Sequence, residues 1–155
     1  MPRVEESVTI NRSADEVFDF VTTPENDSMW TSTAVERRRE TEGPINVGSR
    51  IKAVDKFLGR KIESTFEVTE HEPGRRSSVR LSGPVSATGS YILEPMNGAT
   101  RFRWVMDAQP GLGGVFLGRV TDPVVTFLFR RQLRFNLRRL KEVLEGSREV
   151  RPPAV

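Results

Sequence analysis

The sequence of 155 residues contains no cysteine and only one histidine, His71. Without cysteine, the chain cannot form disulfides, bind a metal through thiolates or use a cysteine nucleophile, and it suits a reducing compartment. A serine, histidine and aspartate triad would have to include His71, and a histidine-rich zinc or iron site cannot be built. We therefore expect neither a metal nor a cofactor.

Long apolar runs and a large excess of charge are also missing. The segment Met1–Glu6 carries acidic residues where a signal peptide would need an apolar run, and no later stretch has the length of a membrane span. These features predict a cytoplasmic protein. Lys and Arg number 24 against 21 Asp and Glu, a formal net charge of +3. The balance does not argue for nucleic acid, and no nucleic-acid-binding motif accompanies it.

The first part of the chain predicts a strand followed by two short helices. Val4 to Ile10 alternate apolar and polar residues, which indicates a strand ending near Asn11. Ser13 with Glu16 three residues later forms a capping-box pattern, which predicts that a helix begins there. Pro24 can open a second short helix that extends to Trp30.

From Thr33 to Ala108 the apolar period changes to two, and turn residues recur at short intervals. The predicted strands cover residues 33–40, 49–57, 60–71, 75–82, 86–95 and 99–108. The pair Asn97 and Gly98 is a strong hairpin signal because both residues tolerate positive φ. Together with the first strand, these segments predict a seven-stranded antiparallel meander.

Helical spacing returns from Leu112 to Leu144, with a kink or break expected near Pro123 because its ring removes a backbone donor. Residues 146–155 contain two adjacent prolines and no periodicity, so we expect a disordered tail. The chain is thus predicted to form one α+β domain over residues 1–145, in which a curved sheet wraps a long C-terminal helix.

This order of elements resembles the helix-grip fold of the START-like and pollen-allergen-like superfamily. The matching segments are Val8–Phe18, Pro24–Trp30 and Gly48–Ile51. The hairpin formed by Tyr91–Pro95 and Gly98–Phe102 is similar to that of the polyketide cyclase/dehydrase-like branch. The resemblance implies a cavity between sheet and helix that holds a hydrophobic or amphipathic small molecule.

Alternation within the strands predicts which side chains face the long helix. The predicted ligand-binding residues are Trp30, Ile51, Ala53, Phe57, Ser64, Phe66, Val79, Leu81, Tyr91, Leu93, Phe102, Trp104 and Met106, with Phe116, Val120, Val124 and Phe127 facing them from the helix. A strongly bent sheet would hold its middle away from the helix and leave an apolar site. The alternative is that the same residues pack as a filled core.

Three polar residues of the predicted strands could have a functional or a structural role. Asp55 falls on the inward face, where it is either a functional acid or base, or a solvated carboxylate at the cavity mouth. Tyr91 can donate a hydrogen bond to a ligand oxygen or belong to the core with a backbone partner. His71 falls on the polar face at a strand end, where we expect it to be exposed.

The C-terminal helix carries a basic cluster: Arg130, Arg131, Arg134, Arg138, Arg139 and Lys141. Such charges commonly form the solvated face of a helix. The functional alternative is peripheral contact with an anionic membrane or an acidic protein through Arg130, Arg134 and Arg138, for which a basic amphipathic helix is suited.

Three hypotheses follow for function. The first is a binding or carrier protein for a hydrophobic small molecule, without a cofactor. The second is a cyclase or dehydratase acting on an aromatic or polyketide-like substrate, with Asp55 or Tyr91 transferring protons. The absence of a dense cluster of inward titratable residues counts against this enzyme. The third is a membrane- or protein-associated module that uses the arginine-rich helix. Oligomeric state does not follow from the sequence.

Overall fold

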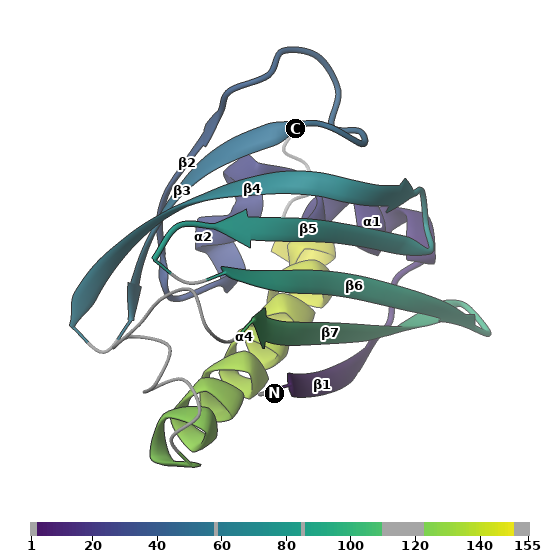
Figure 1. Ribbon diagram of the computed structural model, residues 1–155. Coiled ribbons are helices and arrows are strands. Elements are labelled where there is room, and N and C mark those ends of the chain that lie inside the picture. The colour runs from purple at the N-terminus through teal and green to yellow at the C-terminus, as the bar shows by residue number, and fades with distance from the viewer. Residues whose placement is uncertain (1–2, 58, 85, 110–122, 151–155) are drawn as a thin grey trace.

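The computed structural model describes residues 3–57, 59–84, 86–109 and 123–150 (Figure 1). Its strands are β1 (Arg3–Ile10), β2 (Ala34–Arg39), β3 (Arg50–Phe57), β4 (Arg60–Glu72), β5 (Arg76–Ser82), β6 (Ser86–Met96) and β7 (Ala99–Gln109). Its helices are α1 (Ala14–Val21), the short 3₁₀ helix η1 (Pro24–Asn26), α2 (Asp27–Trp30) and α4 (Pro123–Val150). The predicted strands differ from these by at most one residue at each end.

The described strands form one seven-stranded sheet in the order β1-β7-β6-β5-β4-β3-β2, and each neighbouring pair is antiparallel. Figure 1 shows this sheet curving around α4, with α1 and α2 beside the same helix. Helix α4 packs against β1 and α2. The predicted α+β helix-grip architecture is therefore confirmed.

Local sequence signals account for two of the connections. The Ser13 hydroxyl accepts a hydrogen bond of 3.2 Å from the Glu16 backbone N–H, which caps α1 as predicted. Asn97 and Gly98 have φ values of 48° and 85°, so both central residues of the β6–β7 hairpin occupy the left-handed region. This conformation is the one that favours Asn-Gly in a tight hairpin.

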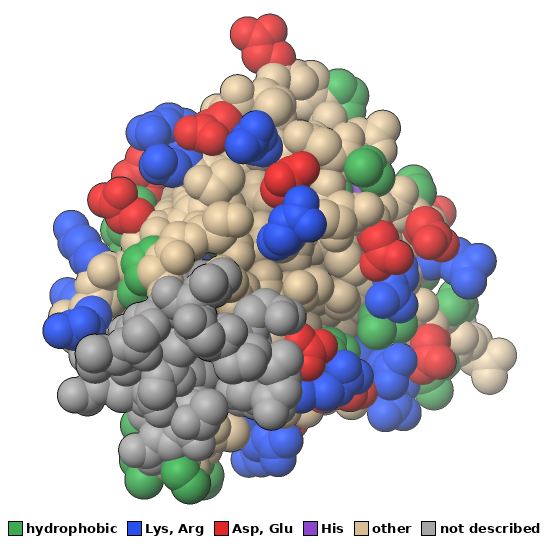
Figure 2. Space-filling model, viewed as in Figure 1, with side chains coloured by type: hydrophobic (Ala, Val, Ile, Leu, Met, Phe, Trp, Pro, Cys, Tyr) green, Lys and Arg blue, Asp and Glu red, His purple; other side chains and the backbone are tan. Residues whose placement is uncertain are grey.

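The sheet has two chemically distinct faces. Ile51 pairs with Phe66, and Tyr91 pairs with Trp104, so these side chains lie on the face that carries the buried residues Leu93 and Phe102. Figure 2 shows the opposite face, on which basic and acidic side chains are interspersed. The predicted one-sided pattern is thus present, with apolar side chains toward the helix.

A bulge in β4 overturns the prediction for His71. The β4–β5 register shifts between Val68 and Glu70, so that His71 pairs with Ser77 and leaves the polar face. Its ring lies 5.1 Å from that of Phe18, and its buried Nδ1 has no hydrogen-bond partner within the described part of the chain. His71 is therefore half-buried against α1 and not exposed, because one extra residue inverts the side-chain alternation that the sequence pattern assumes.

Helix α4 begins at Pro123, a position that proline tolerates because the first N–H groups of a helix lack internal partners. The helix predicted upstream, between Leu112 and Asp122, lies outside the described residues. Helical backbone continues to Val150, into the segment predicted as a tail, and residues 151–155 again lie outside the description. No helix in the described ranges is long and apolar enough to cross a membrane.

The main core lies between the sheet, α1, α2 and the C-terminal half of α4. Its buried residues are Ile10, Val17, Phe18, Val21, Trp30, Leu93, Phe102, Leu137, Leu140 and Leu144. Removing such a side chain from water contributes about 1.5–3 kcal/mol, so this cluster fixes the helix against one end of the sheet.

Candidate ligand-binding site

Four aromatic rings from α2, β6 and β7 meet on the concave side of the sheet. Trp30 lies 5.2 Å from Trp104 and 5.9 Å from Tyr91, measured between ring centroids. The Tyr91 ring lies 5.2 Å from Phe102. Trp30 and Phe102 are both 0% exposed, whereas Tyr91 and Trp104 keep part of their surface. Trp30 and Phe102 are therefore fully buried core residues, whereas Tyr91 and Trp104 lie on the side of the cluster that remains accessible.

The structure divides the other predicted lining residues into four groups. Ile51, Ala53, Ser64 and Leu93 are buried. Phe57, Phe66, Val79, Leu81 and Met106 are half-buried on the concave face. Val124 and Phe127 are exposed on α4, so neither is enclosed between helix and sheet. Phe116 and Val120 lie outside the described residues.

The exposed fractions of these side chains distinguish residues of the packed core from residues that could contact a ligand. A side chain at 0% exposure, such as Trp30, has no room beside it for a water molecule and cannot line an open cavity. The apolar residues Phe66, Tyr91 and Trp104 are only half-buried, although they lie on the inner face of the sheet. A concave, partly accessible apolar surface of this kind suits a small hydrophobic molecule. An enclosed cavity of defined volume stays a prediction.

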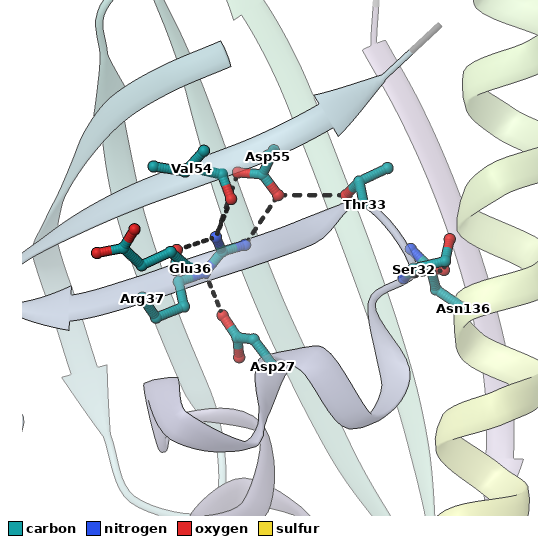
Figure 3. A network of polar contacts seen from close by, with 8 residues as sticks. All are labelled: Asp27, Ser32, Thr33, Glu36, Arg37, Val54, Asp55 and Asn136. Atoms are coloured by element: carbon teal, nitrogen blue, oxygen red, sulfur yellow. Dashed lines mark hydrogen bonds and ion pairs between the residues drawn. The ribbon is translucent and has the colours of Figure 1, made fainter. Parts of the chain in front are cut away.

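Beside this surface lies a charged network centred on Arg37 of β2 (Figure 3). The Arg37 Nε donates to Asp27 Oδ2 at 2.8 Å, and its terminal nitrogens donate to Asp55 at 3.0 and 3.3 Å. The same guanidinium donates to the backbone carbonyls of Glu36 and Val54. The Arg37 side chain is only 7% exposed, and its Cζ lies 5.0 Å from the Phe66 ring centroid. These partners fix Arg37 in one position.

Asp27 is the chemically distinctive member of the network. Burial of its carboxylate raises its pKa from 3.8 to about 6, while the charge and hydrogen bond of Arg37 act in the opposite direction. Burial also raises the pKa of Tyr91 well above its usual value of 10, and the negative charge of Asp27 adds to this effect. Asp27 can thus bind or release a proton near neutral pH, whereas Tyr91 stays a neutral phenol.

Asp55, the carboxylate predicted from strand alternation, does face inward but is neither free nor fully solvated. Its side chain is 20% exposed and accepts hydrogen bonds from Arg37 and from the Thr33 hydroxyl at 3.2 Å. The sequence-based prediction of no dense inward titratable cluster was therefore wrong, because Arg37 bridges the carboxylates of Asp55 and Asp27. The neighbours Glu36, Arg38 and Arg39 are also charged, so β2 has no polar alternation that would mark Arg37 as inward.

A second polar cluster joins the connection between α2 and β2 to α4. Asn136 is buried on α4, and its Oδ1 accepts hydrogen bonds from the Ser32 backbone N–H and hydroxyl, both at 3.2 Å. The Gln132 amide donates to the same oxygen at 3.1 Å and also contacts the Ser32 hydroxyl. Figure 3 shows Ser32 and Asn136 next to α4, to the right of the Arg37 network. Asn136 interrupts the leucine stripe of α4, and this polar residue within an apolar pattern is the sequence signal that marks it.

The outer face of the sheet also carries an open depression. Its lining includes Glu70, Arg76, Ser78 and Ser90. Ser78 bonds to both Glu70 and Ser90, and Arg76 donates to Glu70 at 2.8 Å. Because these polar groups already satisfy one another, the concave side is the stronger candidate for ligand binding.

The fold and this site define a helix-grip protein with an apolar and partly polar interior. The chain matches the family described as polyketide cyclase / dehydrase and lipid transport over residues 1–145, and it belongs to that family. A search of curated proteins found no match.

Solved structures show the same fold at low sequence identity. A protein from Thermus thermophilus has a TM-score of 0.78 at 18% identity, with 94% of this chain and 99% of that chain covered. A START superfamily protein from Mycobacterium smegmatis has a TM-score of 0.76 at 16% identity, covering 93% and 97% respectively. The Zhui aromatase/cyclase from a Streptomyces species has a TM-score of 0.71 at 17% identity, covering 98% and 96%.

Proposed function

We propose that this protein binds a hydrophobic or amphipathic small molecule between the concave face of its sheet and α4, and that it acts as a carrier without a cofactor. The observation that carries this proposal is the incomplete burial of Phe66, Tyr91 and Trp104 on the inner face of the sheet. Membership of a family described by lipid transport and polyketide chemistry supports the same class of ligand. Aromatic rings can cover flat or irregular apolar molecules.

The test uses the dye 1-anilinonaphthalene-8-sulfonate, whose fluorescence rises in apolar surroundings. Leu81 and Arg80 are neighbours on β5 and point to opposite faces of the sheet, which makes them a matched pair. We expect Leu81→Trp to fill part of the site and weaken dye binding by about tenfold, which corresponds to about 1.4 kcal/mol. Arg80→Trp adds the same ring to the outer face and should leave affinity unchanged. Equal effects of both substitutions, or no dye binding, would contradict the proposal.

An enzyme of the cyclase or dehydratase class is the second candidate, and the raised pKa of Asp27 favours it. A carboxyl group with a pKa of about 6 can transfer protons near neutral pH, as general acid-base catalysis requires. Asp27 replaces Asp55 as the preferred proton-transfer group, because burial raises the pKa of the Asp27 carboxyl to about 6. Tyr91 remains a candidate hydrogen-bond donor to a substrate oxygen.

This alternative predicts turnover of a polyketide-like substrate by the purified protein. Replacing Asp27 with Asn should then reduce turnover by roughly two to four orders of magnitude while dye affinity stays within about threefold. A carrier would show no turnover in either form. The paired measurements of turnover and dye affinity on one preparation therefore distinguish the two functions.

A further inference from the structure

Helix α4 presents an outer face opposite to its buried leucines. Leu133, Leu137, Leu140 and Leu144 are buried, which fixes the side that packs on the protein. Phe127, Arg131, Phe135 and Arg138 follow one another at intervals of three or four residues on the other side. We call these four residues the α4 outer face. Figure 1 shows the first turns of α4 extending past β7 toward the lower left.

The two phenylalanines of this face are unusually accessible. Phe127 is 59% exposed and Phe135 is 49% exposed, although aromatic side chains gain free energy when they leave water. They lie eight residues apart, which is a little over two turns along the helix and about 80° around its axis, so both can contact a surface that lies against the outer side of the helix. At a rise of 1.5 Å per residue, the α4 outer face extends about 17 Å along the helix.

The charged side chains of α4 near these two phenylalanine rings are all basic. Residues 123–141 contain no Asp or Glu, and the next carboxylate along α4 is Glu142. Arg130 and Arg134 share one acidic partner, Glu6, at 3.5 and 3.2 Å, while Arg139 donates to the Met29 carbonyl. Among the residues that the structure describes, Arg131 and Arg138 have no ion-pair partner. The two guanidinium groups on the outer face are therefore available to bind anions.

We propose that the α4 outer face docks the protein on an anionic lipid bilayer, with Phe127 and Phe135 entering the headgroup region and Arg131 and Arg138 binding lipid phosphates. Helices that lie in a membrane interface combine exposed aromatic residues with arginine in this way. A second copy of this chain fits poorly, because two such faces would bring arginines against arginines. A ridge of alternating rings and charges is convex, so it suits insertion among headgroups better than a groove on an acidic protein. The proposal does not depend on ligand binding inside the sheet.

The test is flotation of the full chain with vesicles of phosphatidylcholine alone or of phosphatidylcholine with about 30% phosphatidylglycerol. We expect binding only to the anionic vesicles, with a loss of affinity as salt rises. The double variants Phe127→Ser/Phe135→Ser and Arg131→Glu/Arg138→Glu should each reduce the partition coefficient by about tenfold or more. Dye binding and thermal unfolding of each variant check that its fold is intact.

Matched controls come from exposed positions elsewhere on the molecule. Val47→Ser/Met96→Ser removes exposed apolar side chains away from α4, and Arg50→Glu/Arg75→Glu makes the same change of charge. Both controls should keep vesicle binding within about twofold. The proposal is overturned by an absence of binding to anionic vesicles, by equal binding to neutral vesicles, or by equal loss in the control variants. A concentration-dependent dimer that Phe127→Ser/Phe135→Ser abolishes would also overturn it, in favour of a contact between copies.

Discussion

Asp27 joins α2 to Arg37 and carries a carboxylate whose protonation is coupled to folding. Its pKa is about 6 in the folded protein against 3.8 when exposed, so the folded state binds this proton more tightly than the unfolded chain. The stabilising contribution of this group is fully present below pH 3.8 and is lost as the pH rises through about 6. The shift corresponds to about 3 kcal/mol between these limits.

The first prediction follows from that shift. The free energy of unfolding of the wild type should fall relative to that of Asp27→Asn by about 2 kcal/mol, most of the full contribution, between about pH 4 and pH 7. The variant provides the reference because it keeps the other titrating carboxylates, including Glu70 and Glu145, whose pKa values are lowered. Urea denaturation at several pH values measures the difference, and an NMR titration of the Asp27 carboxyl carbon should show a midpoint near 6. A midpoint below about 4.5 would contradict the assignment.

Arg37 supplies a second prediction at this scale. Replacing it with Met keeps the side-chain length but leaves Asp27 and Asp55 without their shared cation, which should cost about 3–5 kcal/mol of stability near neutral pH. The matched control is Arg38→Met, because Arg38 is exposed and its bond to Glu36 is on the surface. That control should change stability by less than about 0.5 kcal/mol. Denaturation curves with similar losses for both variants would show that Arg37 is not the centre of the network.

At the scale of elements, the end of α4 is tied to the β1–α1 connection. Arg12 is buried and donates to the carbonyls of Glu145 and Asn11, both at 2.7 Å. The Glu145 carboxylate accepts from the Asn11 backbone N–H at 2.8 Å and from Lys141 at 2.7 Å. These contacts join residues far apart in the sequence and hold the C-terminal half of α4 on the sheet.

The corresponding prediction concerns Arg12→Ala. Loss of two charge-assisted hydrogen bonds to backbone carbonyls should lower the free energy of unfolding by about 2–4 kcal/mol. Hydrogen exchange should accelerate in α4 from Lys141 onward more than in β5 and β6, because the contact is local to the helix end. Arg50→Ala, at an exposed position of β3, should change neither measurement. Uniform acceleration across the sheet would instead mean that Arg12 stabilises the whole fold.

Elements could be predicted from the sequence because each depends on short-range patterns. Strand alternation, the Ser13 cap and the Asn97-Gly98 turn all act over a few residues, and each corresponds to a described element. The alternation failed at His71 because the β4 bulge is decided by pairing with β5. It also failed to reveal Arg37, whose inward orientation follows from the pairing of β2 with β3 and from the position of Asp27 on α2.

For the whole molecule, the fold and family follow from the order of elements, whereas the chemistry of the interior depends on contacts between distant segments. The sequence identified Asp55, Tyr91 and Trp104 correctly as facing inward. It could not show that Asp55 is held by Arg37, nor that Trp30 and Phe102 are fully buried core residues. Packing thus decides which of the apolar residues are core and which remain available to a ligand.

The central claim is that the concave face of the sheet binds an apolar small molecule. The most direct measurement is an NMR titration of labelled protein with 1-anilinonaphthalene-8-sulfonate, followed at the Trp104 indole, the Met106 methyl and the ring signals of Phe66 and Tyr91. We predict saturable shifts at these inner-face groups, with little change at Ser78 and Ser90 in the outer depression. Shifts confined to the outer depression, or none at Trp104 and Met106 despite dye binding, would contradict the account.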